Sequence, residues 1–199
     1  FPNYQGFENL PDIEDYIIIG AHGLSVDDRT IGMSMTEITG GDEKEYYGAN
    51  TVVNFIKKEV LGYSNVWNKN KASGEQSIII LNACSTGAGE NSLAQQISGN
   101  LNDVVVVAPD SPTGNVQDPV TAKFYQYGPR QEPTTIYENG KLKRDKNGIP
   151  VYKWGKVNNW RLFLNGNMIG TIRGDQKLSH KNIDPIIRAA REAELNTEK

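Results

Sequence analysis

The sequence predicts an α/β fold, with a mostly parallel sheet flanked by helices and followed by a C-terminal β-extension and a terminal helix. Three short runs rich in β-branched residues, at 15–20, 77–82 and 103–108, are apolar on both faces, which is typical of buried parallel strands. A helical pattern separates each of these runs from the next. We therefore expect helices on both faces of an open sheet.

The other elements follow from local patterns. Residues 48–63 repeat apolar side chains at helical spacing, and 93–99 carry a shorter stripe that ends at a glycine. Residues 29–44 predict a small hairpin between the first strand and its helix. From 111 onward, turn signals separate short strand-like runs, which predicts β-structure beside the sheet. The isoleucines and alanines of 183–193 share one stripe, so we expect a terminal helix docked on the body.

Length, charge and cysteine content limit the classes of function. The 199 residues predict a single domain, with a core at about 12–125 and a β-rich extension with the terminal helix at about 126–199. The net charge is −3, and 21 basic residues are interspersed with 24 acidic ones, so nucleic acid is not expected as a partner. One cysteine cannot form an internal disulfide.

No apolar run reaches the roughly 18 residues that cross a bilayer, so we expect a soluble chain without a membrane partner. The first residue is Phe rather than Met, which indicates a processed product or a fragment of a longer protein.

Two predicted strands end in residues that can perform nucleophilic chemistry. His22 and Gly23 follow the first strand, and Cys84 follows the second. Catalytic groups gather at the carboxyl ends of parallel strands, and neighbouring strands lie about 4.8 Å apart. If these two strands are neighbours, an imidazole and a thiol share one crevice. His22 would then be a general base for Cys84, and the N–H groups of Gly23 and Cys84 would form an oxyanion hole.

These motifs resemble those of a known family. "AHG" at 21–23 and "NACSTG" at 82–87 are similar to the His-Gly and Ala-Cys motifs of caspase-like (clan CD) cysteine peptidases, and the second is especially similar to CHAT domains. The resemblance covers roughly residues 15–115. It implies a caspase-haemoglobinase fold, with His22 as base, Cys84 as nucleophile and the amides of Gly23 and Cys84 as the oxyanion hole.

The resemblance implies a cysteine endopeptidase that cleaves protein substrates and needs neither a cofactor nor a metal ion. Many members carry an acidic S1 residue two positions before the cysteine; this chain has Asn82 at that S1 position, so the position predicts no P1 preference. The loop after the next strand helps to line the S1 pocket in the family, and here it contains Asp110 and Ser111. Asp110 would favour a basic P1 residue.

The tail of the chain has a second, looser resemblance. It is rich in Gly and Asn and contains "WRLFLNGN". Together with the start at Phe, this composition is similar to that of the C-terminal toxin domains of polymorphic bacterial effectors. That resemblance implies secretion or delivery into a target cell, and an immunity protein or a carrier chain as partner.

Other interpretations remain open. A lone cysteine at a strand end is commonly inert core, and a caspase-like domain can serve as a non-catalytic regulatory or protein-interaction module. The same dyad can also act on esters. We expect His180 to be a solvated loop or cap residue and Trp154 and Trp160 to be packing aromatics. Asp27 or Asp28 could orient His22.

Overall fold

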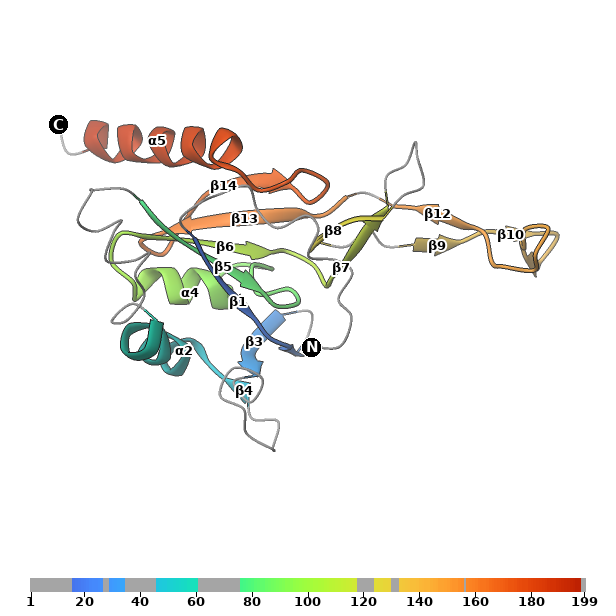
Figure 1. Ribbon diagram of the computed structural model, residues 1–199, viewed down its shortest axis with the longest axis horizontal. Coiled ribbons are helices and arrows are strands. Elements are labelled where there is room, and N and C mark those ends of the chain that lie inside the picture. The colour runs from blue at the N-terminus through green and yellow to red at the C-terminus, as the bar shows by residue number, and fades with distance from the viewer. Residues whose placement is uncertain are drawn as a thin grey trace.

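The computed structural model describes residues 16–26, 29–34, 46–60, 76–117, 124–129, 133–155 and 157–197. Its centre is a five-stranded sheet in the order β1-β5-β6-β13-β14 (Figure 1). The strands are β1 (Tyr16–Gly20), β5 (Ser77–Asn82), β6 (Val104–Pro109), β13 (Asn159–Leu164) and β14 (Asn167–Arg173). β1, β5 and β6 are parallel to one another, whereas β13 and β14 are antiparallel to their neighbours. The predicted mixed α/β class and its three parallel strands are confirmed.

The β-extension differs from the prediction, because two of its strands belong to the central sheet rather than beside it. β13 can lie between β6 and β14 because its apolar residues serve both faces: Leu162 and Leu164 enter one core and Phe163 the other. Asn165 and Gly166, both with positive φ, form the two-residue turn to β14, as Asn-Gly pairs typically do. The sheet therefore continues well beyond residue 125.

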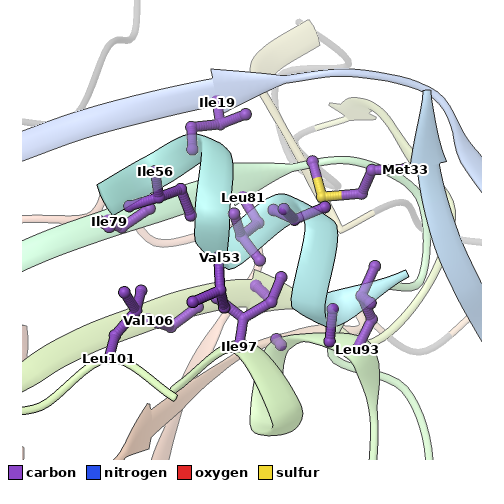
Figure 2. Packing of buried hydrophobic residues seen from close by; sticks show 14 of the residues in the cluster. Ile19, Met33, Val53, Ile56, Ile79, Leu81, Leu93, Ile97, Leu101 and Val106 are labelled. Atoms are coloured by element: carbon purple, nitrogen blue, oxygen red, sulfur yellow. The ribbon is translucent and has the colours of Figure 1, made fainter. Parts of the chain in front are cut away.

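Helices cover both faces of the sheet, as predicted. On one side lie α2 (Ala49–Phe55), which continues as the π-helical turn η2 (Ile56–Val60), and α4 (Leu93–Gly99); on the other lies α5 (His180–Thr197) (Figure 1). Alternation along β5 divides the core in two. Ile79 and Leu81 pack against α2 and α4 (Figure 2), whereas Ile78 and Ile80 pack on the side of α5.

The helix ends follow the sequence signals closely. Ser92 caps α4 by accepting a hydrogen bond from the Gln95 N–H at 3.2 Å, and α4 ends at Gly99. α5 buries Ile183 and Ile187 against the sheet, which confirms the predicted docked helix. Part of the segment predicted as a helix at 48–63 lies outside the described residues.

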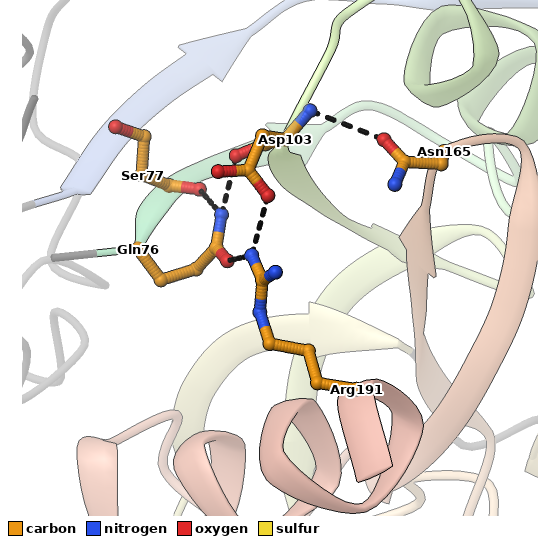
Figure 3. A network of polar contacts seen from close by, with 5 residues as sticks. All are labelled: Gln76, Ser77, Asp103, Asn165 and Arg191. Atoms are coloured by element: carbon orange, nitrogen blue, oxygen red, sulfur yellow. Dashed lines mark hydrogen bonds and ion pairs between the residues drawn. The ribbon is translucent and has the colours of Figure 1, made fainter. Parts of the chain in front are cut away.

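A polar network attaches α5 to the edge of the sheet where β5 and β6 begin (Figure 3). Arg191 on α5 donates to the side chains of Gln76 and Asp103. Gln76 Nε2 also donates to the Asp103 carbonyl at 2.5 Å, and the Asp103 N–H donates to Asn165 Oδ1 at 3.1 Å. This network therefore lies at the amino ends of the parallel strands. The candidate site lies at their carboxyl ends.

Two smaller β-structures flank the sheet. The first contains β2 (Gly23–Val26), β3 (Arg29–Ser34) and β4 (Tyr46–Tyr47). The predicted hairpin is present but starts earlier, because β3 pairs back onto β2. The second is a ribbon that projects from the sheet (Figure 1) and pairs β7 (Thr113–Gln117) with β8 (Phe124–Pro129), β9 (Pro133–Thr135) with β12 (Tyr152–Trp154), and β10 (Tyr137–Glu138) with β11 (Lys141–Leu142).

In the part of the chain that the structure describes, no helix combines the length and the apolar character that crossing a membrane requires.

Candidate functional site

The two motif-bearing strands are neighbours. β1 pairs in parallel with β5 so that Gly20 lies opposite Asn82, and the Ala21 N–H donates to the Asn82 carbonyl at 3.4 Å. His22 and Cys84 therefore each stand two residues past the last paired position of adjacent strands. Both residues lie at the carboxyl ends of the parallel strands, which is where ligands bind in open α/β folds.

The backbone next to His22 packs directly on Cys84. A Cβ atom built on Gly23 would lie 2.5 Å from the Cys84 carbonyl oxygen and 3.0 Å from Thr30 Cγ2. The Thr30 hydroxyl donates a hydrogen bond to the same carbonyl at 2.7 Å. Only glycine fits at position 23 without a shift, so the glycine of the His-Gly motif has a structural reason beside its predicted role.

The pairing of β2 and β3 orients the amide of Gly23. The Ser34 N–H donates to the His22 carbonyl at 2.8 Å, and Gly23 lies opposite Met33 in the same register. Hydrogen-bonded and non-hydrogen-bonded pairs alternate in antiparallel ladders. Gly23 and Met33 therefore form a non-hydrogen-bonded pair, and the Gly23 N–H points away from β3. This orientation is compatible with the predicted role of the amide as an oxyanion donor.

Cys84 lies in a tight turn that is fixed to the end of β6. Ser85 has φ 55, a left-handed conformation that is uncommon for a residue with a side chain. The Ser85 N–H donates to the Ser111 carbonyl at 3.0 Å, and the Gly87 N–H donates to the Pro109 carbonyl at 2.8 Å. The thiol is partly buried rather than enclosed in the core. This geometry differs from that of an inert core cysteine.

The sulfur of Cys84 contacts a residue that the sequence analysis did not select. The Thr113 N–H donates to Cys84 Sγ at 3.4 Å, and Thr113 Oγ1 lies at hydrogen-bond distance from it, also at 3.4 Å. Thr113 is the first residue of β7 and belongs to the loop that the resemblance had identified as a lining of S1. Thr30 was also missed, because it follows the His-Gly motif in a predicted hairpin and nothing in the sequence indicates its contact with Cys84, 54 positions later.

The predicted S1 residues have different surroundings. Asn82 ends β5, and its Oδ1 atom is buried with no hydrogen-bond partner among the described residues. The carboxylate of Asp110 accepts hydrogen bonds from the Asn159 N–H at 2.8 Å and from Asn159 Nδ2 at 3.2 Å, and lies 3.7 Å from Arg161. Ser111 is buried. Asp110 thus joins the end of β6 to β13, whereas Asn82, two residues before Cys84, has an unsatisfied acceptor.

The two histidines lie in different parts of the fold, and the other candidates are core residues or lie outside the described part. His22 has an exposed side chain at the end of β1, whereas His180 starts α5 with its Nδ1 atom 3.1 Å from Asp184 Oδ1. Trp160 is buried in the core beside α5, as predicted for a packing residue. Asp27, Asp28 and the side chain of Trp154 lie outside the described part.

Comparison with known proteins gives one match. The model of a protein family described as Domain of unknown function (DUF8616) matches residues 2–118, which include both motifs and more than half of the chain. No curated protein and no solved structure matches the chain.

Proposed function

The chain belongs to the family described as Domain of unknown function (DUF8616), and we propose that it is a cysteine endopeptidase with a His22–Cys84 dyad. The observation that carries the proposal is the register of β1 and β5, which brings the two motifs to one edge of the sheet, with Gly23 in contact with the carbonyl of Cys84. If Cys84 were only a core residue and His22 only a surface residue, nothing would require the two motifs to lie side by side.

The chemistry follows from these groups. His22 takes the proton of the Cys84 thiol, and the sulfur forms a bond to the carbonyl carbon of the substrate peptide. In this mechanism the N–H groups of Gly23 and Cys84 donate to the oxyanion, because preorganised donors stabilise the negative charge that develops there. The C–N bond then breaks, and the leaving amine takes the proton from His22. A water molecule, deprotonated by His22, attacks the thioester carbon; the C–S bond breaks, the acid is released, and the proton on His22 returns to the sulfur of Cys84.

The fold is compatible with the caspase-haemoglobinase class, which is part of the proposal. In that class, as the resemblance implies, the histidine and the cysteine follow neighbouring parallel strands of a sheet flanked by helices. Here they follow β1 and β5.

Asn82 is our candidate for the selection of the P1 residue. Its buried Oδ1 atom lacks a partner, and a buried acceptor without one costs about 1–3 kcal/mol. A P1 side chain with an N–H or O–H group would remove that cost once the Asn82 side chain turned toward it, because the Oδ1 atom is buried in the present conformation. The carboxylate of Asp110 is less suited to a basic P1 residue, because Asn159 and Arg161 already hold it.

The proposal includes the setting that the resemblance to effector toxins implies. The domain would act in a recipient cell after delivery, and an immunity protein or a carrier chain would restrain it in the producing cell.

The test compares four proteins in a whole-proteome lysate: wild type, Cys84→Ala, His22→Ala and His180→Ala. His180 is the matched control, because it is the chain's other histidine and stands at the start of α5. Mass spectrometry then maps newly formed peptide amino-termini. We expect new termini that share a P1 preference with wild type and His180→Ala, and none with the other two. If all four folded proteins gave the same termini, the domain would be a non-catalytic module, or an enzyme for esters.

A further inference from the structure

Two hydrogen-bonding groups of one residue converge on the sulfur of Cys84. The backbone N–H and the hydroxyl of Thr113 both lie 3.4 Å from Sγ. We propose that Thr113 is a catalytic residue that stabilises the anionic sulfur of Cys84. This inference rests on the proposed function, since it assigns a third group to the same reaction.

The hydroxyl suits both protonation states of the sulfur. In the thiol, the S–H group donates to Thr113 Oγ1, while the Thr113 N–H donates to Sγ. When the proton moves to His22, the S–H bond breaks and its electron pair stays on the sulfur. The hydroxyl then rotates and donates to the anion, which accepts two hydrogen bonds. Hydrogen bonds to an ionised acceptor are stronger than those to a neutral one, so Thr113 favours the thiolate over the thiol.

The backbone of Thr113 is held in position beside the sulfur by the fold. The segment that delivers Thr113 is the one that holds the Cys84 turn, through the bond from the Ser85 N–H to the Ser111 carbonyl. The hydrogen bonds of Asp110 to Asn159 fix the start of the same segment. The sulfur and its two donors are therefore positioned before a substrate arrives.

The same donors act at both ends of the reaction. The sulfur loses its negative charge when it forms the thioester and regains it when the thioester is hydrolysed. Thr113 would stabilise the sulfur as the attacking nucleophile and again as the leaving group. Around it, His22, which follows the neighbouring strand β1, is the titratable group that exchanges the proton, while the Asp110 carboxylate is held by Arg161 and Asn159.

The test measures how fast iodoacetamide alkylates Cys84, which requires no peptide substrate. Thr113→Val removes the hydroxyl at nearly constant volume, and Thr113→Ser keeps it. Thr86→Val is the matched control, because the Thr86 hydroxyl donates to the Ala83 carbonyl at 2.9 Å, in the same turn. Rates are measured at about pH 7, where thiols are mostly protonated, and at about pH 10, where they are mostly ionised.

We expect Thr113→Val to react about three- to tenfold more slowly than wild type at about pH 7 and about threefold faster at about pH 10. Less of its thiol is ionised at neutral pH, but a thiolate with fewer hydrogen bonds is intrinsically more nucleophilic. Thr113→Ser and Thr86→Val should stay within about twofold of wild type at both values. If Thr113→Val failed to fold, Thr113→Ala would replace it.

Equal rates for wild type and Thr113→Val would overturn the inference, and so would a rate that is lower by the same factor at both pH values, which indicates distortion of the turn. Slow alkylation of Thr86→Val would likewise indicate that distortion of the turn, rather than loss of the Thr113 hydroxyl, lowers the rate. Absence of proteolysis by the wild type would overturn the proposed function alone, because the alkylation rates would still report whether Thr113 stabilises the thiolate.

Discussion

The contact between Gly23 and Cys84 can be tested by adding a single methyl group. In Gly23→Ala the new Cβ atom would start 2.5 Å from the Cys84 carbonyl oxygen, although ordinary contacts begin near 3.4 Å. The two backbones must therefore separate by up to 0.9 Å, which is 3.4 Å minus 2.5 Å. The obstacle is a backbone atom within a hydrogen-bonded turn, so no side-chain rotation can relieve it.

This displacement has two consequences of predictable size. Overpacking of this kind costs about 1–3 kcal/mol of the free energy of unfolding. The shift also moves the amide of Gly23 and the imidazole of His22 relative to Cys84. Misplacement of a catalytic group by about 1 Å can lower the rate about a hundredfold. We therefore expect a loss of kcat/KM that exceeds what the loss of stability explains.

The matched control is Gly20→Ala, three residues earlier, where an added Cβ atom would have no neighbour within 4 Å. Urea denaturation gives the free energy of unfolding, and peptide hydrolysis at a temperature where all variants are folded gives kcat/KM. We expect Gly20→Ala to behave as wild type. If Gly23→Ala matched Gly20→Ala in both the free energy of unfolding and kcat/KM, the close contact inferred between the two motifs would be refuted.

Three further predictions concern groups outside the dyad. Asp110→Asn should lower the free energy of unfolding by about 1–2 kcal/mol without changing the P1 preference in the terminus map, because the carboxylate holds β13; a loss of cleavage after basic residues would instead return Asp110 to S1. In urea denaturation, Ile183→Ala should lower the free energy of unfolding by about 2–5 kcal/mol, because this side chain is buried. Arg191→Ala should lower it by about 0–1 kcal/mol, because the Arg191 side chain is 42% exposed. The reverse order would contradict the account in which apolar packing, more than the ion pair, holds α5 on the sheet. Burial raises the pKa of Tyr16 above 10.0, so its contribution to stability is present below that value and is lost as the pH rises further. Between about pH 9 and about pH 11, Tyr16→Phe should therefore lose less unfolding free energy than wild type. Equal losses in the two proteins would show that the ionisation of Tyr16 does not cause the loss.

Much of the sheet could be predicted because its signals are local. Strands that are apolar on both faces fit only a position covered on both sides, and β5 and β6 lie where the sequence predicts them. The sequence predicts β13 in an extension beside the sheet, because "NWRLFL" alone does not reveal its partner strand. That partner, β6, lies about fifty residues earlier, and such long-range pairing leaves no local signal.

The candidate site divides in the same way. His22, Gly23 and Cys84 could be selected because each follows a recognisable strand, and the parallel pairing of β1 with β5 brings these strand ends together. Thr30 and Thr113 could not, because a threonine is common in strands and only the folded chain brings these two onto Cys84. The charge of Asp110 can be read from the sequence, whereas its partners on β13 are known only from the fold.

The most direct test of the dyad is covalent labelling of Cys84 by peptidyl acyloxymethyl ketones that differ in the P1 residue. These probes require an activated thiol beside a peptide-binding site. Intact-mass spectrometry and peptide mapping would follow the adduct in wild type, His22→Ala and His180→Ala. We predict a single adduct on Cys84 whose rate depends on P1, is largely lost in His22→Ala and is unchanged in His180→Ala. Labelling that is absent from the folded wild type, or equally fast without His22, would contradict the assignment of this chain as a His–Cys peptidase.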